Sequence, residues 1–128
     1  MPNAIDKLID RIKQMNNPTV IGIDPKYDMV PTCIKEKYEC NLEGMSEACT
    51  EFNKALIEAT SDIIPAVKLQ MAYFEKLGIY GIKSFKETCE YAKQRGMIIM
   101  IDAKRGDIGS TSSAYSAPYI GRVELRRG

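Results

Sequence analysis

The stretch Met97-Ile98-Ile99-Met100-Ile101-Asp102-Ala103-Lys104-Arg105-Gly106-Asp107 decides how the rest of the chain is interpreted. Its first part is a continuous apolar run, which is typical of a strand covered on both faces in a parallel sheet. The run ends in an acid and passes into a polar loop. We therefore predict a buried strand over Met97–Asp102, followed by a loop over Ala103–Gly109.

Two earlier runs have the same character. Residues 19–24, with the sequence Thr-Val-Ile-Gly-Ile-Asp, are β-branched and apolar and also end in an acid. Residues 66–70 form a second apolar run, with Lys68 at its centre. A lysine is unusual inside so short an apolar strand. The pattern predicts strands over Thr19–Asp24 and Ala66–Gln70.

Helical spacing of apolar residues fills most of the chain between these strands. Helices are predicted over about Asn3–Met15, Thr32–Tyr38, Met71–Leu77 and Gly81–Gln94. A longer helix is predicted to begin at Ser46 and to end near Thr60–Asp62, and Thr111–Tyr115 is predicted to form the first part of a further helix. Residues 41–44 are predicted to form a turn, and Ser46 is a candidate helix cap. Strands that alternate with helices indicate right-handed crossovers and one parallel α/β sheet.

Composition limits the class of protein. The chain has 128 residues, of which 45% are hydrophobic and 27% charged, and its net charge is +1. This balance argues against a nucleic-acid-binding tail. No apolar run approaches the ~20 residues of a membrane helix, and the N-terminus lacks the apolar core of a secretion signal. We expect a single cytoplasmic domain with no membrane segment and no nucleic-acid partner.

Cysteine spacing and the lack of histidine argue against a metal centre. The cysteines at 33, 40, 49 and 89 form no CxxC pair, and the chain contains no histidine. A zinc site is therefore not expected. We expect the thiols to be reduced. Cys49 and Cys89 fall on predicted helices and are expected to pack in the core.

Four charged residues are predicted to gather where the strands end. Because side chains alternate along a strand, Asp102 and Lys104 leave it on one face. Lys68 on the preceding strand enters the same layer, and Asp107 follows the Gly106 turn. An alternating array of ammonium and carboxylate groups keeps its members ionised. Its oriented field suits a reaction in which negative charge develops on carbon, such as a decarboxylation.

Each of these residues also has a purely structural interpretation. Lys68 can snorkel at a sheet edge, and Asp102 can cap the next helix. Asp24 before Pro25 and Asp107 after Gly106 suit ordinary turns. Arg105 is expected to be a solvated loop charge. Thr111 and Ser112 can cap the helix predicted after them.

The run Ile101-Asp102-Ala103-Lys104-Arg105-Gly106-Asp107-Ile108-Gly109-Ser110-Thr111 resembles the Asp-x-Lys-x-x-Asp motif of the orotidine 5′-phosphate decarboxylase family, in the form of its longer bacterial branch. Gly22-Ile23-Asp24-Pro25 is similar to the family's first-strand motif, and Val67-Lys68-Leu69-Gln70 to its second-strand motif. The resemblance covers about residues 3–121. A bare DxKxxD is a weak signal, whereas three motifs in order at strand ends are a specific one.

The resemblance implies the conversion of orotidine 5′-phosphate to uridine 5′-phosphate, the last step of pyrimidine nucleotide synthesis. It implies that Asp24 hydrogen-bonds the substrate ribose and that Lys68 binds the ribose and orients Asp102. Asp102 would face the leaving carboxylate, and Lys104 would donate a proton to C6 of the pyrimidine.

The resemblance also implies a homodimer with a shared active site. Asp107 would complete the array in the partner's site, with Ile108 and Thr111 lining that site. The family uses a small-molecule nucleotide substrate and no metal or organic cofactor.

The family fold is a (β/α)8 TIM barrel, which needs ~250 residues. We therefore expect α/β architecture over residues 1–128, namely the N-terminal part of a TIM barrel with about three parallel strands and flanking helices. The later strands, with the phosphate-binding residues, would be absent. Bare strand edges predict that the chain alone is poorly stable, aggregation-prone or inactive. A soluble and fully active monomer would contradict this expectation.

Two other functions remain open from the sequence. Magnesium-dependent sugar-phosphate decarboxylases and aldolases of the same superfamily share the Asp-x-Lys-x-x-Asp core, although the continuation over residues 106–111 favours the orotidine branch. The second alternative is a non-catalytic fragment that acts only by association.

Overall fold

The computed structural model describes residues 2–105 and 108–112. Three strands form one sheet in the order β1-β2-β3, and both neighbouring pairs are parallel. Their bounds are β1 Val20–Ile23, β2 Ala66–Gln70 and β3 Ile98–Asp102. The helices are α1 Ala4–Met15, the 3-10 helix η1 Tyr27–Met29, α2 Thr32–Lys35, α3 Leu42–Thr60, α4 Met71–Glu75 and α5 Gly78–Gln94. Residues 109–112 are also helical.

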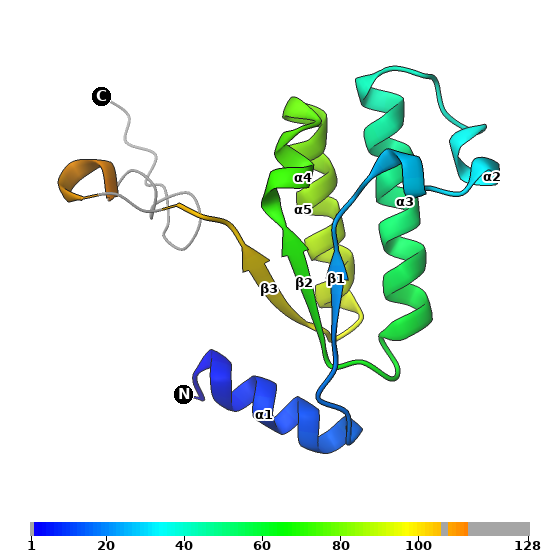
Figure 1. The fold of residues 1–128 in the computed structure, drawn as a ribbon. Coiled ribbons are helices and arrows are strands. Elements are labelled where there is room, and N and C mark those ends of the chain that lie inside the picture. Colours follow the sequence, from blue (N-terminus) through cyan, green and yellow to red (C-terminus); the bar gives the residue numbers. More distant parts are fainter. Residues whose placement is uncertain (1, 106–107, 113–128) are drawn as a thin grey trace, which may run out of the picture.

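The long helices α3 and α5 lie side by side against one face of the sheet (Figure 1). Helix α1 lies at the end of the sheet where the strands begin (Figure 1). Each pair of neighbouring strands is joined by a helical crossover, as expected for parallel strands. The carboxyl ends of all three strands point to the same edge of the sheet, where the short helix α4 follows β2.

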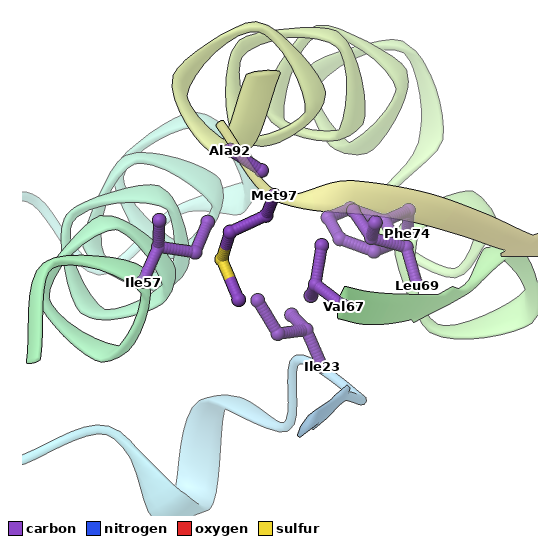
Figure 2. Close-up of a cluster of buried hydrophobic side chains, with 7 residues drawn as sticks. All are labelled: Ile23, Ile57, Val67, Leu69, Phe74, Ala92 and Met97. Carbon is purple, nitrogen blue, oxygen red and sulfur yellow. The ribbon is translucent and has the colours of Figure 1, made fainter. Parts of the chain in front are cut away.

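The core lies between the sheet and helices α3 and α5. Odd-numbered residues of the strands point toward these helices, as Ile23, Val67 and Leu69 do. Figure 2 shows how their side chains meet those of the helices and loops; the cluster consists of Ile23, Ile57, Val67, Leu69, Phe74, Ala92 and Met97. Because β-strands have a period of two, the even-numbered residues must point to the opposite face.

The strand predictions hold to within a residue, but the expectation of burial on both faces was wrong. Val20 of β1, on the face away from the helices, is 39% exposed, and Ile101, on the helix side of the edge strand β3, is 47% exposed. Among the described residues, helices cover one face of the sheet only, and β1 and β3 are edge strands. An apolar run therefore did not distinguish a strand with two covered faces from a strand with one.

Helix α1 begins and ends as predicted. Asn3 accepts a hydrogen bond from the amide of Asp6, and the Asp6 side chain accepts one from the amide of Asn3, which is a capping box. Asn16 ends the helix in the left-handed conformation at φ 49°.

Helix α3 begins four residues earlier than predicted. Asn41 caps it by accepting a hydrogen bond from the amide of Gly44 at 2.8 Å. Ser46 is not a cap but lies inside the helix, where its hydroxyl donates to the carbonyl of Leu42 at 2.8 Å. Residues 41–44 are therefore the start of the helix rather than a separate turn. Asn and Ser are comparable caps, so the sequence did not choose between them.

Helix α5 begins at Gly78 rather than Gly81. Gly78 has φ +62°, a conformation that favours glycine and allows α5 to begin close after the end of α4. Gly96, at φ +74°, follows the end of α5, where a glycine in the left-handed conformation is common. No helix in the described part of the chain is long and apolar enough to cross a membrane.

Candidate active site

Lys68 and Asp102 lie on the same face of the sheet, opposite the helices. In the register of the β2–β3 pair, Lys68 lies opposite Met100 and Gln70 lies opposite Asp102. Lys68 is therefore the diagonal neighbour of Asp102, within reach of a long side chain. Its Nζ lies 3.7 Å from Oδ2 of Asp102.

Lys104 approaches the same carboxylate from the loop that follows β3. Its Nζ lies 3.4 Å from Oδ1 of Asp102, and its side chain is 88% exposed. The two lysines thus flank Asp102, one at each carboxylate oxygen. This arrangement places an accessible proton donor beside a fixed negative charge at the carboxyl ends of parallel strands, where α/β barrels carry their chemistry.

Gln70 is a third partner of Asp102, and the sequence motifs did not predict it. Its Nε2 donates a hydrogen bond to Oδ2 of Asp102 at 2.8 Å. The alternation of strand side chains was the signal that could have found it, because Gln70 is two residues after Lys68 and shares its face.

These contacts make Asp102 a stronger acid. The hydrogen bond from Lys104 is the largest cause of a pKa below the ordinary value, and the hydrogen bond from Gln70 and the charge of Lys68 act in the same direction. Partial desolvation opposes them and is outweighed. Asp102 is therefore a carboxylate at neutral pH.

Asp24 lies one residue after β1 and is exposed. It lines a cavity of about 390 Å³ together with Gly22 and Phe52. Within the described residues, no hydrogen bond or ion pair joins it to Lys68, Asp102 or Lys104. The loop it begins does approach α4, because Nζ of Lys26 lies 5.2 Å from the centre of the Tyr73 ring.

The remaining predicted site residues come after β3 in the sequence. Asp107 lies outside the described residues. Ile108 is 87% exposed, and Thr111 is exposed within the helical residues 109–112. The structure thus brings Lys68, Asp102 and Lys104 together.

Arg105 is not the solvated loop charge that was predicted. It forms an ion pair with Glu75 of α4, and its side chain is 26% exposed. Its Nη1 also donates to the carbonyl oxygen of Lys104 at 3.0 Å. Asp102 is the last residue of β3 and is not the N-cap of any of the helices α1 to α5.

No group of three or more Cys, Asp or Glu side chains is arranged as metal ligands in residues 2–105 and 108–112. The four cysteines, all of them described, are free. Cys49 is buried, as predicted, and Cys89 is partly buried and packs against the core.

A parallel strand–helix fold with charged side chains at the carboxyl ends of its strands belongs to the class of α/β proteins, which carry their sites there in barrels and in open sheets alike. The model of the family described as "Orotidine 5'-phosphate decarboxylase / HUMPS family" matches residues 8–123. The chain belongs to this family.

Individual relatives agree with this assignment. The chain is 38% identical over 122 residues to the orotidine 5′-phosphate decarboxylase of Petrotoga mobilis, covering 94% of the chain and 40% of that protein. It is 39% identical over 116 residues to that of Clostridium tetani, covering 91% of the chain and 38% of the relative. The structure of the Leishmania donovani OMP decarboxylase matches with a TM-score of 0.67 and 29% identity, covering 91% of this chain and 39% of that one.

The chain therefore spans about 40% of the length of the relatives it matches. The predicted fold, the N-terminal part of a TIM barrel with three parallel strands and flanking helices, is confirmed.

Proposed function

We propose that this chain supplies the charged reaction centre of a protein that decarboxylates orotidine 5′-phosphate to uridine 5′-phosphate. Membership of the family and the names of its relatives support this reaction. The observation that carries the proposal is the position of Asp102 between the ammonium groups of Lys68 and Lys104.

The reaction requires a carbon–carbon bond to break without leaving a free carbanion. The C6–carboxylate bond of the pyrimidine breaks, carbon dioxide leaves, and the electron pair stays on C6. Asp102 faces the leaving carboxylate, and the ammonium of Lys104 stabilises the charge that develops on C6. One N–H proton of Lys104 then moves to C6 and gives the product. The exposed position of the Lys104 side chain makes its Nζ accessible to a substrate.

The other predicted site residues have supporting roles in this proposal. Lys68 holds Asp102 and binds the ribose, and Asp24 also hydrogen-bonds the ribose. Asp107 completes the charged array in the site of a second copy, with Ile108 and Thr111 lining that shared site. The working form is then a homodimer.

The proposal includes no metal or organic cofactor, because the lysine ammonium supplies both the positive charge and the proton. A cytoplasmic location is also part of it, supported by the free thiols of all four cysteines.

The test joins this chain to the part of a relative that it does not span. Residues 1–121 are joined to the C-terminal segment of the Petrotoga mobilis protein, and conversion of orotidine 5′-phosphate is followed by ultraviolet absorbance. Controls are the C-terminal segment alone and the Asp102→Asn variant of the fusion.

We expect conversion by the fusion, unchanged in excess chelator, and none by either control. A folded fusion that is inactive would contradict the proposal and favour a fragment acting by association. Activity only on sugar phosphates, and only with magnesium, would favour the other branch of the family.

A further inference from the structure

We propose that Gln70, Glu75 and Arg105 form a clamp that holds the Asp102 side chain to the end of β2 and the Lys104 backbone to helix α4, so that these three are positioning residues for the reaction centre. The effect of the clamp on turnover rests on the proposed function, whereas the effect of the clamp on the geometry of Asp102 does not. The clamp has two points of attachment, one at each end of the short segment that carries the two charged groups.

The first point is the hydrogen bond from Gln70 to Asp102. These residues are direct partners in the β2–β3 register, and Nε2 donates to Oδ2 at 2.8 Å. The bond occupies one side of the carboxylate and limits rotation of its plane. Oδ1 remains for Lys104.

The second point is Arg105, which joins α4 to the backbone of Lys104. One guanidinium nitrogen, Nη1, donates to the carbonyl oxygen of Lys104 at 3.0 Å, and the other, Nη2, pairs with Glu75. The planar guanidinium presents donors in a fixed fork, so one side chain can hold both acceptors at once. Lys104 itself is 88% exposed, so its own side chain does little to hold this loop in place.

Helix α4 is a firm support for the clamp because it is anchored in the core. Phe74 is fully buried and Met71 is 3% exposed. The helix follows directly on β2, so Lys68, Gln70 and Glu75 belong to one continuous stretch of strand and helix. The clamp surrounds a small cavity of about 100 Å³ between α4 and the loop after β3. The charged groups are thus held from one side by β2 and α4.

The experiment measures the reaction centre directly in the full 128-residue chain. Asp102 is labelled with ¹³C and its carboxyl pKa is determined by NMR in the parent and in Glu75→Gln, Arg105→Gln, Arg105→Lys and the double variant Glu75→Gln/Arg105→Gln. The matched control is Glu87→Gln, which removes another half-exposed glutamate that pairs with a lysine, at 3.5 Å from Lys54.

We expect the pKa of Asp102 to move up toward its ordinary value in each clamp variant and to stay unchanged in the control. The double variant should shift no further than either single variant, because the pair acts as a unit. Arg105→Lys should raise the pKa of Asp102 as Arg105→Gln does, because a lysine keeps the positive charge but lacks the planar pair of guanidinium donors. An unchanged Asp102 pKa in all clamp variants would overturn the proposal, as would an equal shift in Glu87→Gln.

Turnover in the fusion with the Petrotoga mobilis segment gives the second measurement. Misplacing a catalytic group by about 1 Å can cost up to ~100-fold in rate. We therefore expect kcat to fall roughly 10- to 100-fold in Glu75→Gln, with KM within about twofold. If the fusion is inactive but the NMR shifts appear, the proposed function fails and the clamp stands. If turnover and the Asp102 pKa are both insensitive to Glu75, the clamp fails and the proposed function stands.

Discussion

Lys68 and Asp102 lie on neighbouring strands, two residues out of register, and their charged atoms are 3.7 Å apart. This relationship arises from the parallel sheet, because both side chains point away from the helices and emerge near the ends of their strands. It joins two of the sequence motifs that carry the family resemblance into one site.

The acidity of Asp102 should depend on Lys104. The hydrogen bond from Lys104 is the largest cause of its lowered pKa, so Lys104→Ala should raise that pKa toward its ordinary value. A carboxylate with a lowered folded-state pKa stabilises the fold above its unfolded-state pKa. That contribution disappears as the pH falls through the folded-state pKa.

The measurement is a ¹³C NMR titration of Asp102, with Lys93→Ala in the last turn of α5 as the control. The same pKa in the parent and in Lys104→Ala would show that the contact between the two side chains has no electrostatic effect.

Gly81 should not tolerate alanine although it lies in a helix. A Cβ at this position would lie 1.8 Å from the carbonyl oxygen of Phe74, where α4 and α5 approach each other. Alanine normally favours a helix over glycine by about 1 kcal/mol. We expect the opposite here, a loss on the order of 1–3 kcal/mol, because backbone atoms must move apart.

Urea denaturation of Gly81→Ala checks this expectation. Gly22→Ala is the control, since a Cβ there meets nothing within 4 Å. A Gly81→Ala chain as stable as the parent would show that α4 and α5 do not approach each other so closely.

The core between α3 and the sheet should dominate the stability of the chain. Ile57 is fully buried, so Ile57→Ala should lower the free energy of unfolding by about 2–5 kcal/mol. Ile79 on α5 is 78% exposed, and Ile79→Ala should change the free energy of unfolding by less than about 0.5 kcal/mol. Both are isoleucines in helices, so their difference in urea denaturation isolates burial. Equal losses would contradict the core assignment.

The four thiols should fall into two reactive classes. Burial raises the pKa of Cys49 and of Cys89 to about 11, so few thiolates form there near neutral pH. Cys33 and Cys40 are exposed. With Ellman's reagent at about pH 8, where an ordinary thiol is partly ionised, we expect two thiols to react quickly and two slowly, and all four quickly in denaturant. Four equally fast thiols in the folded chain would contradict the packing of α3 and α5.

Much of this fold was predictable because the spacing of apolar residues, and the residues that end a strand or a helix, are features of the local sequence. Strands β1 and β3 are followed by polar or turn-forming residues, and β2 is followed directly by helix α4. The proximity of Lys68 to Asp102 results from the alternation of side chains along the strands and from their parallel pairing. The start of α3 was not predictable, because Asn41 and Ser46 are both good caps. The close approach of Gly44 to the backbone of Glu39 distinguishes them only in three dimensions.

The partners of the site were less predictable than its charged residues. Arg105 has no local feature that distinguishes a solvated side chain from one paired with Glu75, thirty residues earlier. Its pairing depends on the path of the loop over α4. Gln70 carries no charge, and the predicted array contained only charged residues. Its register position nevertheless makes it the direct neighbour of Asp102.

The most direct test of the central claim is the rate of ¹⁴CO₂ release from carboxyl-labelled orotidine 5′-phosphate by the completed chain and by its Lys104→Ala variant. Lys93→Ala serves as the control. If Lys104 stabilises and protonates C6, its removal should lower kcat at least ~100-fold while the control keeps the parent rate. Equal release by Lys104→Ala and the parent would contradict the account.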